Sequence, residues 1–468
     1  MYNYHYPCSA QADSKAKMAT PTLHVAMFPW FAMGHITPFL HLSNKLAENG
    51  HKISFFIPTK TQNKINHLNL HPHLFKFIPL EVNVDGHPDG AETTEDVRFD
   101  QHSAICKAFD LTQEQLGSSL LHLKPDFIFH DLSYWLPSLV KPMKIISVYF
   151  ATTSAMNYTQ IVSVVVKDMQ VQPPEIYPGS SSVKPPSFLL KEFFIVDAEC
   201  DGNISFFDRA YSSMKESEVL CFPGFISEIE APFIDYLESH FNKPFLILEP
   251  TLNPTPTSQQ LEKKWDDWLS GFDKGSVVYC ALGTEANLEK DQFQELLLGL
   301  ELTHLPFLAR LKAPKGAETV QEGFPEGFEN RVKGRGVVYG DWVPQKLILD
   351  HPSVGCFVSH CGYGSMFEAL VSECQVVLVP QHGDQFANAG FMSKRLNVAV
   401  EVERRDDDGW FSRENVCKAV KSVMDDGVEI GEEKRANHQK LSRLLMLAQG
   451  VRSDYFNKFI NQLQVIRK

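Results

Sequence analysis

Short apolar runs alternate with helical patterns through the first half of the chain. Residues 23–30 form an apolar run fit for a buried strand, and residues 31–50 place apolar side chains on one helical face. Pro38 suits the first turn of that helix, and Gly50 suits its end. Further strands are predicted at residues 53–57, 75–80, 127–129 and 145–150. Alternation of this kind indicates a parallel sheet covered by helices.

Two changes in composition divide the chain. Residues 168–203 carry several prolines and a serine run, which predicts a long loop region. Residues 249–258 contain too much proline for the interior of a helix or strand, so they are predicted to link two domains. Beyond them the alternation starts again, with strands predicted at residues 277–282, 307–311, 337–339, 355–358, 376–379 and 398–402. The pattern therefore predicts an α/β protein with two domains of similar size.

Charge and cysteine content narrow the class of protein. The 468 residues carry a formal net charge of -13, which disfavours nucleic acid or an anionic membrane as the main partner. No apolar signal segment is present, and polar residues interrupt the longest apolar region, residues 145–166, so no membrane span is expected. Nine cysteines without a CxxC pair indicate reduced thiols in the cytoplasm. Cys356, His360 and Cys361 lack further ligands at zinc spacing, so no metal site is predicted.

The richest chemistry lies between residues 342 and 385. The predicted strand at 355–358 leads into a glycine turn that opens a helix, and helix N-termini at strand ends attract anions. Gly362 and Gly364 let backbone N–H groups approach a phosphate, while His360 and Ser365 can donate to its oxygens. A glycine turn before a helix is also ordinary turn chemistry, so this feature alone does not establish a diphosphate site.

Three neighbouring features favour a nucleotide sugar. Trp342 follows a predicted strand, where its flat face could stack on a base, and Glu368 lies one helical turn after Ser365, where it could accept hydrogen bonds from ribose hydroxyls. Asp384 and Gln385 follow the strand at 376–379 and offer an acceptor and an amide to sugar hydroxyls. A core tryptophan and a surface glutamate are the ordinary alternatives. The order of the features, from base to sugar, favours the site.

This 44-residue segment resembles the signature box of plant UDP-dependent secondary-product glycosyltransferases, and the likeness extends over residues 22–465. The resemblance implies the GT-B fold: two facing Rossmann-like domains with a cleft between them, the second holding the UDP-sugar and the first the acceptor. Together with the changes in composition, it divides the chain into a disordered leader (1–21), an acceptor domain (22–248), a linker (249–258), a donor domain (259–445) and a C-terminal helix that closes the structure (446–468).

The resemblance also implies which side chains contact the donor. Trp342 is expected on uracil, Gln345 and Glu368 near the ribose, His360, Gly362 and Ser365 on the diphosphate, and Asp384 and Gln385 on the sugar. Gly283 and Thr284 resemble the Gly-Ser turn that the family places beside the phosphates. Val343, Tyr363 and Gly364 complete the expected donor site.

The box departs from the common pattern at two adjacent positions. Tyr363 stands where tryptophan is usual, and Gly364 stands where asparagine is usual, which removes one polar contact near the phosphates. This pair is similar to members that extend a sugar on a flavonoid, so the resemblance favours a flavonoid or anthocyanin 3-O-glycoside as the acceptor. A triterpenoid, another aglycone or a saponin is the alternative. Gln385 leans towards UDP-glucose as the donor, with UDP-xylose and UDP-rhamnose also open.

Catalysis needs a base near the acceptor hydroxyl. His35 follows the first predicted strand, and Asp131 follows the strand at 127–129, where its carboxylate could fix the histidine tautomer. A structural role is the ordinary alternative for a histidine, but this pair matches the catalytic pair of the family. The resemblance implies a single displacement with inversion and no metal or other cofactor. The acidic run at residues 406–408 contains a DxD pattern, but its charged surroundings favour a solvated loop.

The acceptor pocket is less defined by the sequence. Trp30, Phe31 and Trp135 flank His35 and Asp131, so they are predicted to contact the acceptor, although core packing explains most other aromatic residues. Two classes of function stay open: an active transferase, expected to act as a monomer, and a catalytically silent protein that binds nucleotide sugars or phenolics. The intact catalytic pair and sugar-binding pair favour the enzyme.

Overall fold

The computed structural model describes most of the chain. The described residues are 21–84, 86, 90–97, 101–166, 173–176, 180, 187–188, 199–200, 204–224, 227–248, 260–286, 288–425, 427–450 and 452–468. Apart from Pro21, the predicted leader lies outside them, as do the predicted linker and most of the predicted loop region at 168–203.

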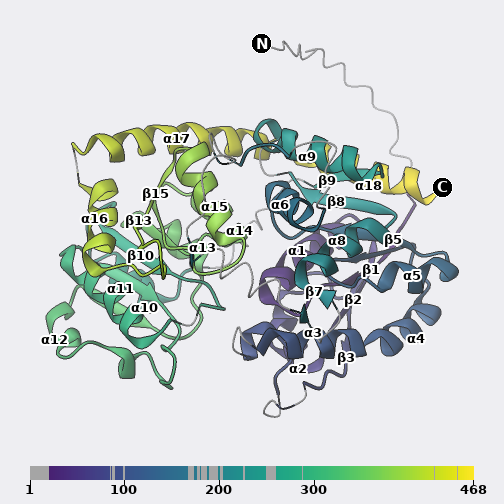
Figure 1. Ribbon diagram of the computed structural model, residues 1–468, viewed down its shortest axis with the longest axis horizontal. Helices are drawn as coiled ribbons and strands as arrows, with labels where there is room; N and C mark the ends of the chain where they lie inside the picture. Colours follow the sequence, from purple (N-terminus) through teal and green to yellow (C-terminus); the bar gives the residue numbers. More distant parts are fainter. Residues whose placement is uncertain are drawn as a thin grey trace, which may run out of the picture.

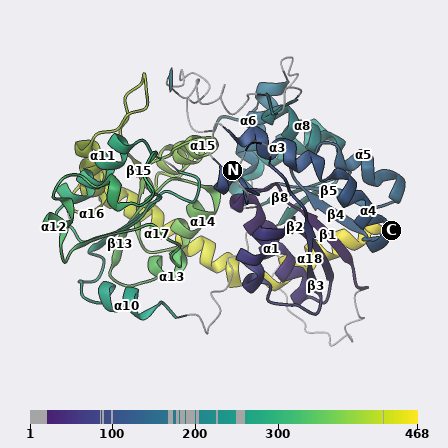
Figure 2. The ribbon, with the colours of Figure 1, turned by 90° about the horizontal axis from the view of Figure 1, so that it is seen from below.

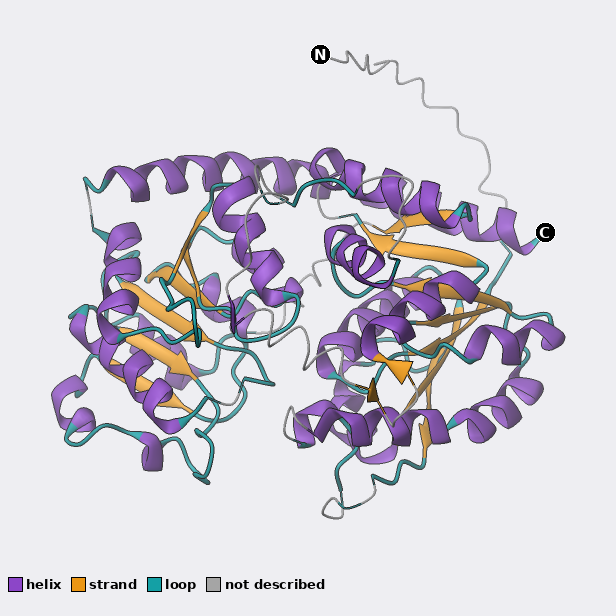
Figure 3. Ribbon diagram, in the orientation of Figure 1, coloured by secondary structure: helices purple, strands orange, loops and turns teal. Residues whose placement is uncertain are grey.

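The first domain is built on a seven-stranded parallel sheet with strand order β3-β2-β1-β4-β5-β8-β9 (Figure 3). All five strands predicted in this half are confirmed, whereas β8 and β9 were missed because each is a single short run beyond the proline-rich region. The strands are β1 His24–Phe28, β2 Lys52–Pro58, β3 Phe75–Leu80, β4 Phe127–His130, β5 Ile146–Phe150, β8 Val219–Pro223 and β9 Phe245–Leu248.

Alternate residues of β1 show how this sheet is covered on both faces. Val25 and Met27 pack in one apolar cluster with α1 and the C-terminal helix, and Ala26 and Phe28 pack in another with α3, α4 and α5. The helices are α1 Met33–Glu48, α2 Thr59–Ile65, α3 His102–Leu111, α4 Gln113–Leu123, α5 Leu136–Val140, α6 Ala155–Val165, α8 Phe206–Glu216 and α9 Ser227–Phe241, with short helices η1 Asn66–Leu68, η2 Thr94–Asp96 and η4 Lys141–Met143 and a two-stranded ribbon of β6 Glu199–Cys200 and β7 Ile204–Ser205.

Helix α1 starts earlier than the sequence predicted. Pro38 lies inside the helix and not in its first turn, so its missing N–H leaves the carbonyl of Gly34 without the usual helical bond. The start is set instead by the carbonyl of Ala32, which accepts hydrogen bonds from the N–H groups of His35 and Ile36, both at 2.9 Å. His35 therefore sits in the first turn of α1, directly after β1.

The second domain carries a six-stranded parallel sheet with order β12-β11-β10-β13-β14-β15, and all six predicted strands are confirmed. One face packs on α11 and α16, and the other packs on α14. The strands are β10 Val277–Ala281, β11 Phe307–Arg310, β12 Gly336–Tyr339, β13 Val354–Ser359, β14 Gln375–Leu378 and β15 Ala399–Glu401. The helices are α10 Lys263–Leu269, α11 Lys290–Leu302, η5 Gln321–Gly323, α12 Phe328–Val332, α13 Gln345–Leu349, α14 Tyr363–Val371, α15 Gln385–Gly390, the π-helix η6 Phe391–Arg395 and α16 Arg413–Met424.

The C-terminal helices join the two domains (Figures 1 and 2). Helix α17, Glu429–Gly450, runs along the second domain, and α18, Arg452–Arg467, lies on the first. Phe459 and Leu463 of α18 pack into the cluster that holds β1, and Arg467 pairs with Asp126 at 2.8 Å. The predicted domain boundary at residue 445 falls inside α17. None of the described helices is long and apolar enough to cross a membrane.

Both sheets reverse their strand order at one place, and this places the functional site. The reversal lies between β1 and β4 in the first sheet and between β10 and β13 in the second. The paired strands end level with each other, since Phe28 is opposite His130 and Ala281 is opposite Ser359. Loops leaving such a point diverge and open a crevice at the carboxyl ends of the strands, where ligands bind in open α/β sheets.

Candidate functional site

His35 and Asp131 meet where the first sheet reverses its strand order, between β1 and β4, which is the switch point of that sheet. Asp131 follows β4 and has no exposed surface; its Oδ1 accepts the N–H groups of Trp30 at 2.8 Å and Leu132 at 2.7 Å. Its Oδ2 lies 2.6 Å from Nδ1 of His35, and Oγ1 of Thr152 lies 3.1 Å from the same nitrogen. Because a carboxylate only accepts, Nδ1 carries the hydrogen, and the neutral ring keeps its lone pair at Nε2. The His35 side chain is 24% exposed.

The charges around His35 strengthen it as a base. Burial lowers the pKa of the imidazole, but the carboxylate of Asp131 opposes this through its charge and hydrogen bond, and Glu285 and Asp384 add to the effect. The pKa of His35 is therefore raised above its usual value. The ring holds a proton more firmly than free histidine, and its neutral, proton-accepting form prevails above this raised pKa.

A second histidine is enclosed at the switch point of the second sheet. Gly283 follows β10 with φ +78°, and Gly362 precedes α14; a Cβ added to either would lie 2.6 Å or 2.5 Å from Nε2 of His360. Only glycine fits at both positions. Burial, followed by the charge of His382, lowers the pKa of His360 to about 4, so its ring is neutral at physiological pH. Among the described residues, none hydrogen-bonds to its buried Nδ1.

A cation that the sequence analysis missed lies beside this turn. Arg310 ends β11, and its Nη1 donates to the carbonyl of Gly283 at 2.8 Å, while its Nε donates to the carbonyl of Asp341 at 3.3 Å. Its guanidinium therefore helps hold the glycine turn and brings positive charge to a place suited to a diphosphate. The signal was available, because Arg310 falls in a predicted strand of the same sheet as residues 277–282.

Three of the residues expected near the ribose and diphosphate lie together, on α13 and α14. Nε2 of Gln345 donates to Oε2 of Glu368 at 2.6 Å and to Oγ of Ser365 at 3.1 Å. Burial raises the pKa of Glu368, against the lowering effect of the Gln345 amide. Trp342 is 71% exposed at the start of the same segment, whereas the adjacent Val343 is buried. An exposed indole offers a stacking surface, and the Ser365 hydroxyl and Glu368 carboxylate offer hydrogen-bond acceptors.

Asp384 belongs to a closed ring of four side chains drawn from both domains. Its Oδ2 accepts hydrogen bonds from Oγ1 of Thr153 at 2.8 Å and from Nδ2 of Asn388 at 3.2 Å. Nδ2 of Asn157 completes the ring by donating to Oδ1 of Asn388 and to Oγ1 of Thr153, both at 2.9 Å. Burial raises the pKa of Asp384, against these hydrogen bonds and the charges of His382 and His35. The ring fixes the carboxylate where the two domains meet.

The other expected sugar and phosphate positions differ in their surroundings. Gln385 is buried, and its Oε1 accepts the N–H groups of Gln381 at 2.9 Å and His382 at 3.3 Å, so it braces the loop ahead of α15. Gly364 is exposed, and a Cβ added there would meet nothing within 4 Å. A Cβ at that position therefore clashes with nothing, so glycine is not required there to avoid a clash at Cβ, and its presence removes the polar side chain that is usual there. Thr284, next to Gly283, is half-buried.

The aromatic residues expected to contact the acceptor are mostly core residues. Phe31 has no exposed surface and Trp30 has 3%, and both rings lie edge-on to Phe109, with centroids 4.9 Å and 5.1 Å away. Trp135 is half-buried, and its Nε1 donates to Oδ1 of Asp110 at 2.7 Å. Phe31 offers no surface to a ligand here. Its ring packs instead against Phe28 and Phe109 in the apolar cluster of the first domain.

Two of the hydrogen bonds that join the domains involve Thr153 and Thr94. Thr153 donates to Asp384, as above, and Oγ1 of Thr94 donates to Oε1 of Glu285 at 2.6 Å. Neither threonine nor Glu285 was predicted from the sequence, although Glu285 directly follows the Gly283–Thr284 turn. The switch points of the two sheets therefore face each other.

The acidic DxD run is separate from this site. Residues 406–408 are exposed, as predicted, and Asp408 pairs with Arg405. In the part of the chain that the structure describes, no group of three His, Cys, Asp or Glu side chains is placed to hold a metal ion.

The chain has two parallel α/β domains whose switch points face each other. A histidine–aspartate pair lies on one side, and a glycine turn at a helix N-terminus lies on the other. This is the arrangement of a GT-B glycosyltransferase. The family model described as UDP-glucoronosyl and UDP-glucosyl transferase matches residues 206–445. The chain belongs to this family and is a UDP-glycosyltransferase.

Plant relatives match the chain along nearly its whole length. It is 47% identical over 453 residues to an anthocyanidin 3-O-glucoside 2''-O-glucosyltransferase of Ipomoea nil, with 95% of this chain and 98% of the relative covered. It is also 47% identical over 461 residues to a cyanidin 3-O-galactoside 2''-O-xylosyltransferase of Actinidia chinensis var. chinensis, with 96% of this chain and 99% of the relative covered.

Solved structures share the fold at lower identity. UGT89C1 of Arabidopsis thaliana complexed with UDP-L-rhamnose superposes with a TM-score of 0.75 at 22% identity, over 96% of this chain and 99% of that one. UGT73P12 of Glycyrrhiza uralensis complexed with glycyrrhetinic acid 3-O-monoglucuronide gives a TM-score of 0.76 at 19% identity, over 96% of each chain. At these identities the likeness establishes the GT-B fold alone.

Proposed function

We propose that this UDP-glycosyltransferase transfers a sugar to a sugar hydroxyl of a flavonoid or anthocyanin 3-O-glycoside and so lengthens an existing sugar chain. The observation that carries the proposal is the 47% identity, along nearly the whole chain, to two enzymes whose names specify anthocyanidin or cyanidin 3-O-glycoside acceptors and the 2'' position. UDP-glucose, UDP-xylose and UDP-rhamnose are the candidate donors.

The proposed chemistry begins at Nε2 of His35. Asp131 holds the hydrogen at Nδ1, so Nε2 takes the proton of the acceptor hydroxyl, and the carboxylate stabilises the resulting imidazolium. The hydroxyl oxygen attacks the anomeric carbon while the bond from that carbon to the phosphate oxygen breaks. UDP leaves with the bonding electrons, and the configuration at the anomeric carbon is inverted.

The proposed donor site lies on the second domain. Uracil would stack on Trp342, the ribose hydroxyls would bond to Glu368, and Asp384 would accept from the transferred sugar. Arg310 and the N-terminus of α14 supply positive charge to the leaving diphosphate, so we propose a reaction without a metal or other cofactor. Monomeric state and cytosolic location stay predictions.

A mixed-substrate assay tests this proposal. The purified protein would be given competing UDP-sugars with flavonoid 3-O-glucosides, 3-O-galactosides, saponins and free aglycones, and the products would be identified by mass spectrometry. We expect addition of one sugar to the flavonoid glycosides, and no product from His35→Ala. Products from saponins or aglycones alone would refute the proposed acceptor. UDP binding without transfer to any acceptor would favour the silent binding protein instead.

A further inference from the structure

Glu285 places a carboxylate at the meeting point of the two domains. It lies two residues beyond Gly283 and is half-buried, and its Oε1 accepts Oγ1 of Thr94 at 2.6 Å. Within the described part of the chain, no side chain or backbone group donates a hydrogen bond to its Oε2. One oxygen is therefore held by the first domain, and the other is left for a ligand.

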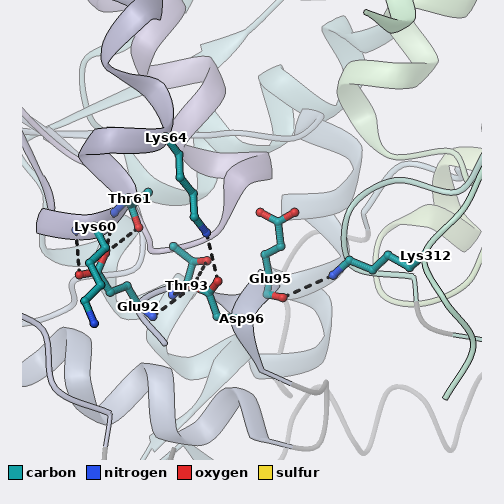
Figure 4. Close-up of polar contacts among 8 residues, drawn as sticks. All are labelled: Lys60, Thr61, Lys64, Glu92, Thr93, Glu95, Asp96 and Lys312. Atoms are coloured by element: carbon teal, nitrogen blue, oxygen red, sulfur yellow. Dashed lines mark hydrogen bonds and ion pairs between the residues drawn. The ribbon is translucent and has the colours of Figure 1, made fainter. Parts of the chain in front are cut away.

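The segment that carries Thr94 is firmly fixed (Figure 4). The Glu92 carboxylate accepts the N–H of Lys60 at 2.9 Å, the N–H of Thr61 at 2.7 Å and Oγ1 of Thr61 at 2.9 Å, which ties the segment to the start of α2. Oδ2 of Asp96 accepts both the N–H and Oγ1 of Thr93 at 2.9 Å, which closes a capping box. Thr94 lies between these anchors, so its hydroxyl has a defined position.

Glu285 lies on the His35 side of the site. The N–H of Thr94 donates to the carbonyl of Phe31 at 2.9 Å, and the carbonyl of the next residue, Ala32, accepts the N–H of His35 at 2.9 Å. Thr94 is therefore bound to the chain that leads into the first turn of α1. The contact between Thr94 and Glu285 brings this carboxylate to the acceptor side of the donor domain.

The carboxylate of Glu285 is anionic. Burial raises its pKa, but the charge of His382, the hydroxyl of Thr94 and the charges of His102 and His35 outweigh that effect and lower it. Glu285 in turn helps to raise the pKa of His35. Oε2 of this half-buried carboxylate is not among the sealed, unpartnered polar atoms of the described residues, so a ligand hydroxyl can reach it and donate a charge-assisted hydrogen bond.

We propose that Glu285 binds hydroxyl groups of the sugar that the acceptor already carries, next to the hydroxyl that His35 deprotonates; this rests on the proposed function. Vicinal sugar hydroxyls can donate to the free Oε2, whereas the flat face of an aglycone cannot. The carboxylate of a uronic acid at this place would be repelled by the negative charge of Glu285. Glu285 therefore selects neutral glycosides over free aglycones and over glucuronides, and Thr94 is the positioning residue that orients it.

Kinetics of Glu285→Gln on matched acceptors tests the proposal. The substitution keeps the shape and removes the charge. We expect KM for a neutral flavonoid 3-O-glucoside to rise about tenfold or more, with KM for the UDP-sugar unchanged. The ratio of kcat/KM for the flavonoid 3-O-glucuronide to that for the glucoside should rise. Glu373→Gln, which alters an exposed carboxylate of the same domain, should leave all these constants unchanged.

Variants of Thr94 separate positioning from folding. Thr94→Val should shift KM for the glucoside in the same direction as Glu285→Gln, and Thr94→Ser should restore it. A rise in KM for the UDP-sugar alone, or an unchanged KM for the glucoside in Glu285→Gln, would overturn the assignment. Wild-type enzyme that converts no glycoside in the same assay would instead refute the proposed function, and with it this inference.

Discussion

The substitution Asp131→Asn probes the proposed base without changing its shape. Oδ1 of the amide can still accept the N–H groups of Trp30 and Leu132, so the loop after β4 should keep its backbone bonds. The amide nitrogen would then face Nδ1 of His35, where the carboxylate now accepts at 2.6 Å. Two donors cannot share that contact. The imidazole must therefore carry its hydrogen at Nε2 and turn its lone pair towards the asparagine.

This tautomer leaves no lone pair for the acceptor hydroxyl, and the stabilising charge is also lost. Loss of the equivalent carboxylate in Ser-His-Asp enzymes lowers kcat by about 10⁴-fold, and we expect a loss of about 10³–10⁴-fold here. Steady-state kinetics with a flavonoid 3-O-glucoside would measure it, and UDP affinity by calorimetry would serve as the control, since the donor site is on the other domain. A loss of less than tenfold in kcat, with UDP affinity intact, would refute the assigned role of Asp131.

Three further predictions concern the donor site and the pH profile. Glu368→Ala should weaken UDP binding by about 1–3 kcal/mol for the lost charged hydrogen bond, measured by calorimetry; an unchanged affinity would remove it from the ribose. Gly283→Ala should lower UDP affinity because the new Cβ meets His360 at 2.6 Å, whereas Gly316→Ala, with φ +81° and no neighbour, reports backbone strain alone. If Gly283→Ala and Gly316→Ala lower UDP affinity equally, the contact between the new Cβ and His360 has no effect on donor binding. Because neutral His35 is the active form, kcat/KM should fall as pH drops through its raised pKa, with an inflection above 6.5; an inflection below 6.5 would contradict the charge argument.

The alternation of apolar runs predicted both sheets because most of their strands are short apolar segments between helices. Eleven strands were found this way, and the two missed ones, β8 and β9, are the last strands of the first sheet. The start of α1 was predicted wrongly because Pro38 was assigned by its preference for first turns. The carbonyl of Ala32, which sets the true start, is invisible to sequence preference.

Some contacts of the site could likewise be anticipated from the sequence, and others could not. Gln345, Ser365 and Glu368 are close in sequence, and the predicted strand-turn-helix pattern already placed them in one segment; hydrogen bonds join them in the structure. Thr94 and Glu285 are 191 residues apart, and Thr153 and Asp384 are 231 apart. Contacts of this kind depend on how two domains face each other, which periodicity within either domain does not specify. Burial of Phe31 has a different origin, because segments of its own domain cover it, among them Phe109 of α3.

A competition between one glycoside and its own aglycone tests the central claim most directly. Wild type and His35→Ala would each receive a UDP-sugar with an equimolar mixture of a flavonoid 3-O-glucoside and the free flavonoid, and mass spectrometry would follow both products. The account predicts the diglycoside from wild type, no product from His35→Ala, and equal UDP affinity for the two proteins. Preferential glycosylation of the free flavonoid, or continued transfer by His35→Ala, would contradict it.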